Sequence, residues 1–303
     1  MIIIINFKGL TLDDKQIINE FVNMNSIESY EYLFSSLYMW RKLNRVKYAI
    51  IDDTLIIEKN EEGKGTFYAR PLHYKKENLV NLIEILKKRN EDYTDRDYFF
   101  GDVDQDFIND LKEYTDYNIE IIEDVDDFEY VYKTEDLIEL RGKKYHGKKN
   151  HVNTFEKTYN YEIKAITNES VIKDCLELLH KWHEEVLKTI DKEMCMEIDA
   201  IKDIFGELQY LNLESIAVYV DEKLAGFTVG ERVNDKLAVI HVERGELEYK
   251  GVYAFINRKF LMECFSDTEF VNRQEDTGNS GLRKAKKSYH PVKMVKKYLV
   301  KLS

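Results

Sequence analysis

Periodic apolar positions divide the first half of the chain into short helices and strands. Apolar residues recur with helical spacing over 12–24 and 76–89, which predicts two amphipathic helices, and an aromatic-rich stretch at 30–43 predicts a third. Between these helices, KYAIID, TLIIEK and GTFYARPL are apolar or β-branched runs separated by Asp52–Asp53 and by the turn-like EEGKG. The first half is therefore expected to mix helices with short strands.

The second half has a clearer order of elements. Helices are predicted over about 168–188 and 198–208, and the next stretch, SIAVYVDEKLAGFTVGERVNDKLAVIHVER, holds three apolar runs joined by short polar links. Such runs predict an antiparallel three-strand meander. A helix over 252–265, the strand TEFVN and a lysine-rich final strand, VKMVKKYLVKL, follow it.

This order of elements resembles that of the GNAT acyltransferase fold. We therefore expect an α+β protein with two tandem GNAT-like domains, each a mixed and mostly antiparallel sheet flanked by helices. The first domain is expected over residues 1–135, and the second, carrying the active site, over 136–303. A long helix over 137–159, either continuous or broken, is expected just after the junction, and Gly142 and Gly147 weaken it.

Charge is distributed unevenly along the chain. The 45 Lys and Arg against 57 Asp and Glu give a net charge of −12, which argues against nucleic-acid binding over the whole surface. However, residues 141–151 contain five Lys or Arg and no acid, and residues 277–303 contain eight and no acid. Two basic segments on an acidic body predict a local anion site. The alternative is that each is a solvated face of one sign.

Several classes of site are not indicated by the sequence. His180 and His183 share a helix face but have no third metal ligand at useful spacing, and the acids of 102–113 fit a capped helix better than a calcium loop. The three cysteines form no C-x-x-C pair, and no apolar run approaches the roughly 18 residues that span a bilayer. We expect a cytoplasmic protein with no metal and no firmly implied cofactor.

The segment VNRQEDTGNSGLRKAKKSYHP, at 271–291, concentrates candidate chemistry. Asn279 can cap a short helix, whose N-terminal N–H groups would attract an anion, with the basic residues after it adding charge. Glu275 and Asp276 are candidates for a general base that accepts a proton from an amine or hydroxyl nucleophile. The alternative is a surface turn in which Arg273 pairs with an acid.

The link after the meander, ERGELEYKGVYAF, is a second candidate for phosphate binding. In a GNAT fold, the helix that begins here holds the cofactor pyrophosphate at its N-terminus. This chain offers only Lys250 and Gly251 before the helix, so the glycine pattern expected for coenzyme A is incomplete. A plain connection between strand and helix is the alternative.

Six segments together resemble the family of the phosphatidylglycerol lysyltransferase C-terminal domain, in a stand-alone form without the transmembrane half. They cover nearly the whole chain and are SSLYMWR at 35–41, FEYVY at 128–132, LRGKKYHGKKNHVNTF at 140–155, AGFTVGE at 225–231, HVER at 241–244, and NRQEDTG followed by GLRKAKKSY within 272–289. Gln274 departs from the family pattern, in which an acid is common there.

The resemblance implies roles for residues that match these segments. The implied catalytic group is Asn272, Arg273, Glu275 and Asp276, supported by Glu231, His241 and Glu243. The implied substrate- or phosphate-binding group is Lys143, Lys144, His146, Lys148, Lys149, His151, Lys250, Gly251, Gly278, Gly281, Arg283, Lys284, Lys286 and Tyr289.

The resemblance also implies an activity. Membrane-bound relatives move an aminoacyl group from aminoacyl-tRNA to a lipid hydroxyl, so we expect an acyl or aminoacyl transferase with aminoacyl-tRNA, or else acyl-coenzyme A, as donor. The acceptor would be an amine or hydroxyl of a small molecule or lipid headgroup. The alternatives are a non-catalytic module that binds a nucleotide, an RNA end or an anionic headgroup, and an acetyl-coenzyme A-dependent N-acetyltransferase.

Overall fold

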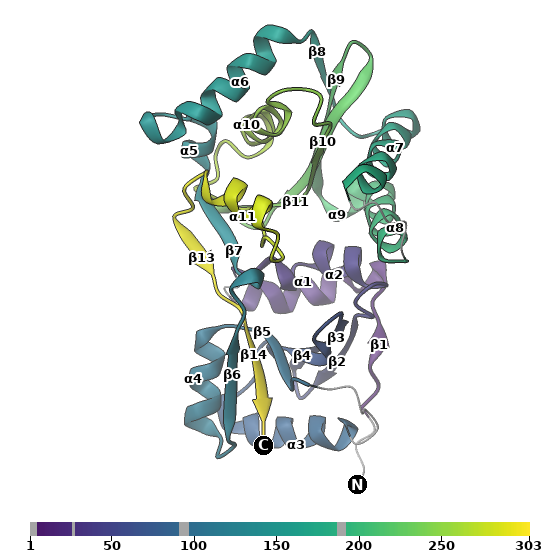
Figure 1. Cartoon of the computed structure of the whole chain (residues 1–303). Coiled ribbons are helices and arrows are strands. Elements are labelled where there is room, and N and C mark those ends of the chain that lie inside the picture. Colours follow the sequence, from purple (N-terminus) through teal and green to yellow (C-terminus); the bar gives the residue numbers. More distant parts are fainter. Residues whose placement is uncertain (1–4, 26–27, 91–96, 187–191) are drawn as a thin grey trace. The chain divides into compact units, whose positions relative to one another are not determined.

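The computed structural model describes residues 5–25, 28–90, 97–186 and 192–303 (Figure 1). The chain divides into two compact units, unit 1 being residues 1–128 with 295–303 and unit 2 being 129–294. Within the described residues, each unit contains one seven-stranded mixed sheet. The α+β class expected from the sequence is thus confirmed.

Unit 1 is built on a sheet in which only the fourth and fifth strands pair in parallel. The strands, in spatial order, are β1 (Lys8–Gly9), β2 (Lys47–Ile51), β3 (Thr54–Glu61), β4 (Gly65–Ala69), β5 (Phe100–Val103), β14 (Tyr298–Leu302) and β6 (Ile119–Glu123). The helical segments are η1 (Leu12–Asp14), α1 (Lys15–Met24), η2 (Tyr30–Tyr32), α2 (Phe34–Trp40), η3 (Lys76–Asn78), α3 (Leu79–Asn90), α4 (Gln105–Tyr114) and η4 (Val125–Asp127).

Two amphipathic helices close the core of unit 1. The apolar positions of α3, including Leu82 and Leu86, meet those of α4, including Phe107, over the strand residue Phe100. Asp104 caps α4 by accepting a hydrogen bond from the Phe107 backbone N–H at 2.9 Å. The acids of this stretch therefore begin a helix, as expected, because a cap satisfies an N–H that would otherwise have no partner.

Unit 2 is built on the sheet β13 (Lys293–Val295), β7 (Glu129–Lys133), β12 (Phe270–Asn272), β11 (Leu237–Gly245), β10 (Lys223–Arg232), β9 (Leu213–Val220) and β8 (Tyr161–Lys164). Strands β9, β10 and β11 form the predicted antiparallel meander, and β11 pairs with β12 in parallel. The helical segments are α5 (Thr134–Glu139), η5 (Lys143–Tyr145), α6 (His146–Thr158), α7 (Glu169–Val186), α8 (Lys192–Gly206), α9 (Leu208–Leu211), α10 (Val252–Cys264) and α11 (Ser280–Lys287).

Helix α10 packs closely on the unit 2 sheet. A Cβ at Gly226 of β10 would lie 2.4 Å from Ile256 Cδ1, so glycine is needed there for this approach. On its other flank, α10 contacts α6 through Phe255 and Phe155, whose stacked ring centroids are 4.3 Å apart. Burial of two such rings stabilises the layer by a few kcal/mol, at about 25 cal/mol per Å². Helix α6 is thereby fixed beside the end of the sheet.

The helix expected over 137–159 is broken into α5 and α6. Leu140 and Gly142 have positive φ angles of 48° and 86°, a left-handed conformation that ends a helix. Gly147, by contrast, lies inside α6. Within the described ranges, no helix combines the length and apolar character needed to cross a bilayer.

The unit boundaries differ from the sequence division at 135/136. Strand β7 belongs to the unit 2 sheet, where it pairs with β12, and β14 belongs to the unit 1 sheet, where it lies between β5 and β6. The final lysine-rich segment therefore does not form the single strand expected. It provides β13 and β14 to different sheets.

Candidate functional site

Polar side chains gather where β11 and β12 part. The parallel pairing covers only Leu237–Val239 against Phe270–Asn272, after which β12 ends and β11 continues to Gly245. Divergence of two parallel strands leaves room between them for side chains from both. We name the residues here the strand-parting site: Glu231, His241, Glu243, Asn257, Arg273, Gln274 and Tyr289.

A β-bulge directs His241 into this site. Val229 pairs with Val242 and Gly230 pairs with Ile240, so His241 is the extra residue on β11. Its side chain is buried, with Nε2 2.8 Å from Glu231 Oε1 and Nδ1 3.3 Å from the side-chain nitrogen of Gln274. Because an amide nitrogen only donates, Nδ1 accepts from Gln274 and Nε2 donates to Glu231. With this orientation of the Gln274 amide, the Nε2–H tautomer satisfies both contacts.

Arg273 is the central cation of the site. Its Nη2 lies 2.8 Å from Glu243 Oε1, and the other Glu243 oxygen accepts a hydrogen bond from Asn257 at 3.1 Å. Burial opposes the charge of Arg273, but the Glu243 carboxylate outweighs burial and holds the pKa of the guanidinium above its usual value. Among the described residues, the buried Nη1 has no well-aligned hydrogen-bond acceptor, and the Tyr289 side chain lies beside the guanidinium. Nη1 is therefore the donor of Arg273 that a ligand could engage.

Tyr289 carries two cations on its ring. The Arg273 Cζ lies 4.8 Å and the Lys148 Nζ 3.9 Å from the ring centroid. Lys148 comes from the inner side of α6 and is partly buried; burial, and next the charge of Arg273, lower the pKa of Lys148 to about 8. Burial raises the pKa of Tyr289 to about 12, so the phenol is neutral at physiological pH.

Asp276 does not have the setting of a general base. Its buried carboxylate accepts hydrogen bonds from Tyr130 Oη at 2.5 Å, from Arg283 Nε at 2.8 Å and Nη2 at 2.7 Å, and from the Gly278 N–H at 3.1 Å. These bonds, those of Arg283 above all, lower the pKa of Asp276 to about 2. The pair fixes the loop to α11. Both oxygens of Asp276 are occupied, and Arg283 directs its Nε and Nη2 to this carboxylate, so the pair has a structural role.

Lys286 was expected to bind phosphate, but its side chain binds backbone carbonyls of the loop before α11. Its buried ammonium donates to the carbonyls of Arg273 at 2.6 Å, Gln274 at 3.1 Å and Glu275. An ammonium has three hydrogens, so these three carbonyls occupy all of them. Burial lowers the pKa of Lys286 to about 8. The clamp holds Gln274 at a positive φ of 60°, a conformation that non-glycine residues rarely adopt.

Asn272 and Glu275 flank this clamp with different surroundings. Asn272 is buried; its Nδ2 donates to Glu129 Oε2 at 2.5 Å, and its Oδ1 accepts from the Gln274 N–H at 2.8 Å. Asn272 thus supports the loop. Glu275 is half-buried and remains the acid best suited to the predicted base, because Asp276 is fully engaged.

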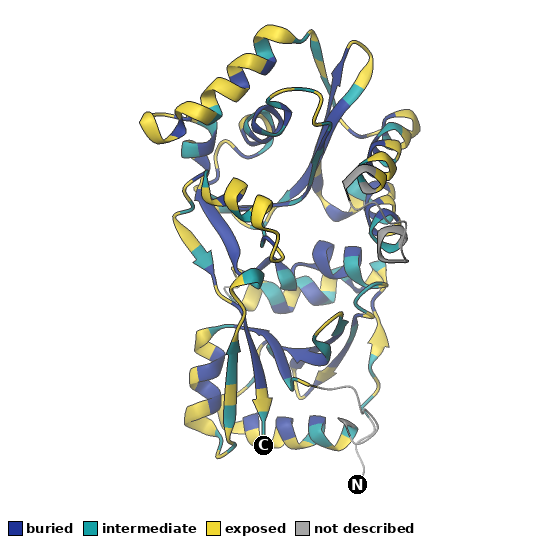
Figure 2. Ribbon diagram, in the orientation of Figure 1, coloured by how far each residue is buried: buried dark blue, intermediate teal, exposed yellow. Residues whose placement is uncertain are grey.

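The other expected anion ligands lie mainly on the surface. Lys143, Lys144, His146, Lys149 and His151 are exposed along η5 and α6, and Gly278, Gly281 and Lys284 are exposed around the start of α11 (Figure 2). These residues, most of them basic, lie on the exposed surface and are not part of the buried strand-parting site. Lys250 is also exposed, and its backbone N–H donates to Tyr159 Oη at 3.1 Å.

Gly251 has a packing reason to be glycine. Its φ is 91°, and a Cβ there would lie 2.2 Å from the His151 carbonyl oxygen. The start of α10 therefore approaches the backbone of α6 directly. The glycine follows from this approach without any phosphate, which leaves phosphate binding at Lys250 and Gly251 a prediction.

Sequence reasoning missed Asn257, Tyr130 and Glu129. Each lies in an apolar run, on α10 or β7, and is buried, so periodicity assigns it to the core. A signal did exist for Asn257, since an amide inside AFINRKF requires a buried polar partner, which is Glu243.

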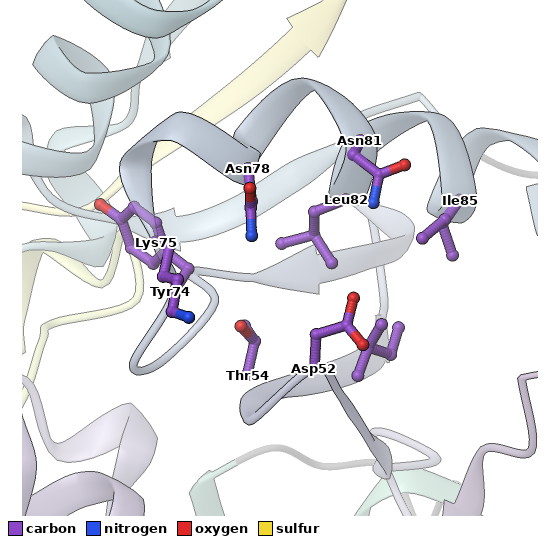
Figure 3. A pocket seen from close by; sticks show the side chains of 9 residues that line it. Asp52, Thr54, Tyr74, Lys75, Asn78, Asn81, Leu82 and Ile85 are labelled. Atoms are coloured by element: carbon purple, nitrogen blue, oxygen red, sulfur yellow. The ribbon is translucent and has the colours of Figure 1, made fainter.

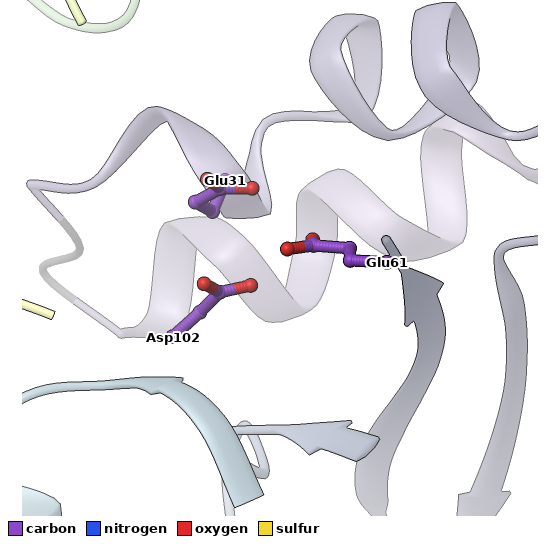
Figure 4. A group of neighbouring side chains, drawn as sticks. All are labelled: Glu31, Glu61 and Asp102. Atoms are coloured by element: carbon purple, nitrogen blue, oxygen red, sulfur yellow. The ribbon is translucent and has the colours of Figure 1, made fainter. Parts of the chain in front are cut away.

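Three carboxylates in unit 1 resemble a metal site but surround a lysine. Glu31, Glu61 and Asp102 bring carboxylate oxygens within 4.8 Å of one another (Figure 4). The buried Lys59 ammonium lies 2.5 Å from Glu31, 2.7 Å from Asp102 and 3.7 Å from Glu61. Lys297 adds a second cation 2.7 Å from Glu31, and Lys64 adds a third 2.9 Å from Glu61. Three lysines therefore face three carboxylates, and the oxygens that resemble a metal site are engaged in ion pairs.

A small pocket in unit 1 contains none of the residues chosen from the sequence (Figure 3). Its wall combines the turn after β2 with the start of α3, and its polar Tyr74 hydroxyl already donates to Asp110 at 2.6 Å. The lining residues are Ile51, Asp52, Thr54, Tyr74, Lys75, Asn78, Asn81, Leu82 and Ile85.

Comparison with solved structures establishes the fold more specifically. A conserved protein of unknown function from Bacteroides thetaiotaomicron is 31% identical, with a TM-score of 0.88 over 99% of this chain and 100% of that one. The C-terminal domain of a putative lysylphosphatidylglycerol synthetase from Agrobacterium fabrum is 12% identical, with a TM-score of 0.62 over 95% of this chain and 91% of that one. A tandem GNAT protein from the clavulanic acid biosynthesis pathway is 8% identical, with a TM-score of 0.53 over 99% and 98%. The predicted tandem GNAT-like fold is confirmed.

Sequence comparison identifies the family. An uncharacterised protein of Mycoplasmoides gallisepticum is 29% identical over 189 residues, which are 61% of this chain and 59% of that relative. The match thus spans less than two thirds of the relative's length. The model of the family described as phosphatidylglycerol lysyltransferase, C-terminal, matches residues 25–301. The chain belongs to the family of the phosphatidylglycerol lysyltransferase C-terminal domain.

Proposed function

We propose that the protein transfers an aminoacyl group from aminoacyl-tRNA to an amine or hydroxyl acceptor, with the strand-parting site and Glu275, which follows Gln274 in the same loop, as its active site. The observation that carries this proposal is the buried Nη1 atom of Arg273, which has no well-aligned acceptor among the described residues and lies beside Lys148 and Tyr289. Arg70 Nε and Arg244 Nε are also buried donors without an acceptor there, so the combination of Nη1 with a second cation at one aromatic ring is what points to a ligand. The family membership supplies the class of reaction.

The chemistry requires few protein groups. The acceptor nucleophile attacks the ester carbonyl of the aminoacyl group, Glu275 takes its proton, and the tetrahedral intermediate collapses to the new amide or ester. The ribose hydroxyl leaves with a proton returned by Glu275. Arg273 provides positive charge for the negatively charged substrate, and the His241–Gln274 contact holds the loop that carries both residues.

Two features favour aminoacyl-tRNA over acyl-coenzyme A as donor. The exposed lysines of η5 and α6 extend the positive charge outward from Lys148, which suits a chain of phosphates. In addition, Gly251 is explained by its 2.2 Å approach to His151, so the start of α10 offers no independent indication of a pyrophosphate cradle.

A second candidate is the non-catalytic binding module. Full pairing of Asp276 with Arg283 and Tyr130 favours it, because the site then has one candidate base instead of two. The acetyl-coenzyme A-dependent transferase is the weaker alternative, and binding of that cofactor would support it.

The test is transfer of label. The full chain is incubated with bulk tRNA charged with a mixture of radiolabelled amino acids and with pooled small-molecule amines or phosphatidylglycerol vesicles. The proposal predicts a labelled product that is not free amino acid and that disappears in Glu275→Gln. Tight tRNA binding without any product would favour the binding module.

A further inference from the structure

Lys148 differs from the other lysines of the basic segment at 141–151. Lys143, Lys144 and Lys149 are exposed, whereas Lys148 lies on the inner side of α6 with its Nζ 3.9 Å from the Tyr289 ring centroid. Among the described residues, Lys148 has no ion pair and no hydrogen bond. A partly buried ammonium without an acceptor is unfavourable unless a ligand supplies one.

Arg273 places a second donor at the same aromatic ring. Its Cζ is 4.8 Å from the ring centroid, so Lys148 Nζ and Arg273 Cζ cannot be farther apart than the sum of 3.9 and 4.8 Å. Glu243 is the acid that compensates these two cations, and its oxygens are already engaged by Arg273 Nη2 and Asn257. One positive charge and the Nη1 donor are left over.

Nearby cations do not compete for this role. Lys286 donates its hydrogens to three backbone carbonyls, and Arg283 makes a bidentate contact with Asp276. Among the described inner cations, Lys148 Nζ and Arg273 Nη1 are therefore the donors without a well-aligned protein acceptor, and both belong to side chains placed at the ring of the neutral Tyr289. An ammonium and a guanidinium together match the oxygens of a phosphate group.

We infer that Lys148 and Arg273 Nη1 form a binding subsite for one phosphodiester group of the RNA end that carries the aminoacyl group. This inference rests on the proposed function and makes it more specific. The exposed Lys143, Lys144 and Lys149 continue the positive charge away from the subsite, which fits several successive phosphates better than the single phosphate of a lipid headgroup. The inner pair fixes the end of the strand, and the outer lysines attract the rest.

The experiment measures binding of the 5′-phosphorylated trinucleotide CCA to the full chain, with inorganic phosphate as competitor. Lys148→Met is compared with Lys149→Met, which removes the same charge from the exposed side of the same helix. We expect Lys148→Met to weaken trinucleotide binding by about tenfold or more and Lys149→Met by about twofold at most. Lys148→Arg, which keeps the charge, should retain most of the affinity. Thermal unfolding of each variant checks that the fold is intact.

Three outcomes separate this inference from the proposed function. Equal trinucleotide binding by wild type and Lys148→Met would overturn the subsite. Failure to bind the trinucleotide, with Lys148-dependent binding to phosphatidylglycerol vesicles, would also overturn it and assign the pair to a headgroup. Lys148-dependent trinucleotide binding without aminoacyl transfer to any acceptor would leave the subsite standing and contradict the transferase.

Discussion

The carboxylate of Asp276 accepts two hydrogen bonds from one guanidinium, from Arg283 Nε at 2.8 Å and from Nη2 at 2.7 Å. This bidentate pair joins the loop after β12 to α11, and the Tyr130 hydroxyl ties the same carboxylate to β7. It converts a segment rich in potential catalytic groups into a rigid support for Arg273 and Glu275. The pair therefore acts on the site through the position of its neighbours.

The first prediction concerns the stability that this pair provides. Asp276→Asn should lower the free energy of unfolding by about 3 kcal/mol, because it leaves Arg283 without its buried counterion. Asp267→Asn, which breaks the exposed pair between Arg232 and Asp267, is the matched control and should leave stability unchanged within error. Urea unfolding measures both. Equal effects of the two substitutions would show that the buried pair is not a special support.

The pH dependence of stability follows from the same carboxylate. The folded state lowers the pKa of Asp276 to about 2, below the value of about 4 for an unfolded chain. The pair therefore contributes fully above pH of about 4, and its contribution is lost as the pH falls through 2. As the pH is lowered from about 4 to 2, the melting temperature of the wild type should therefore fall more than that of Asp276→Asn. Thermal melting at a series of pH values measures both.

The second prediction assigns the base. Glu275→Gln should reduce the turnover number by at least about 100-fold, the typical contribution of general-base catalysis, with no change in melting temperature. Glu263→Gln, an exposed acid on α10, is the control and should be fully active. Retention of turnover by Glu275→Gln would exclude Glu275 as the base.

The third prediction is a loss of RNA affinity at alkaline pH. The pKa of Lys148 is lowered to about 8, so its charge, and with it the affinity for the trinucleotide, should fall as the pH rises from 7 to 9. Tyr289 stays neutral over this range, but the pKa of Lys286 is also about 8. Lys148→Arg distinguishes the two lysines. Affinity should become independent of pH in this variant if Lys148 is responsible and should keep its pH dependence if Lys286 is.

The fourth prediction tests the packing of α10 on α6. Gly251→Ala should destabilise the protein by about 2 kcal/mol or more, since the new Cβ meets the His151 carbonyl and alanine disfavours a φ of 91°. Gly147→Ala is the control within α6, where a Cβ meets nothing within 4 Å, and should stabilise by up to about 1 kcal/mol. A stable Gly251→Ala protein would contradict the close approach.

The fifth prediction concerns the ion network of unit 1. Lys59→Met should destabilise the protein by about 4 kcal/mol, because three carboxylates would be left together around an apolar side chain. Calcium should then raise the melting temperature of this variant but not that of wild type, in which the ammonium lies among the carboxylates. Lys173→Met, at an exposed helical pair with Glu177, is the control. Stabilisation of wild type by calcium would contradict the structural role of Lys59.

Much of the fold follows from local pattern. The amphipathic helix over 76–89, the acid-capped helix after Asp104 and the meander over 213–245 are all predicted, because periodicity and capping act within a few residues. The assignment of β7 and β14 to their sheets is not, since strand pairing over long sequence separations leaves no mark in either strand alone.

The roles of the site residues remain predictions, whereas their contacts can be described. Five residues chosen by motif resemblance lie in contact, pair by pair, where β11 and β12 part: Glu231 with His241, Arg273 with Glu243, and Arg273 with Tyr289. The resemblance could not distinguish residues that would contact a substrate from residues that hold the loop in place. A sequence shows a basic run at 283–287, but only the folded chain shows that Arg283 and Lys286 are engaged by Asp276 and by backbone carbonyls. The bulge that turns His241 inward is likewise a property of the pairing between strands.

Filter binding of bulk aminoacyl-tRNA at about 50 and 200 mM salt, with coenzyme A as competitor, shows whether the protein recognises an aminoacyl-tRNA donor. We expect tight binding that weakens steeply with salt, because several lysines would contact phosphates, and no competition by coenzyme A. We also expect a clear loss of binding in Lys148→Met. Binding of coenzyme A with no binding of aminoacyl-tRNA would exclude the proposed donor and favour the acetyl-coenzyme A-dependent transferase.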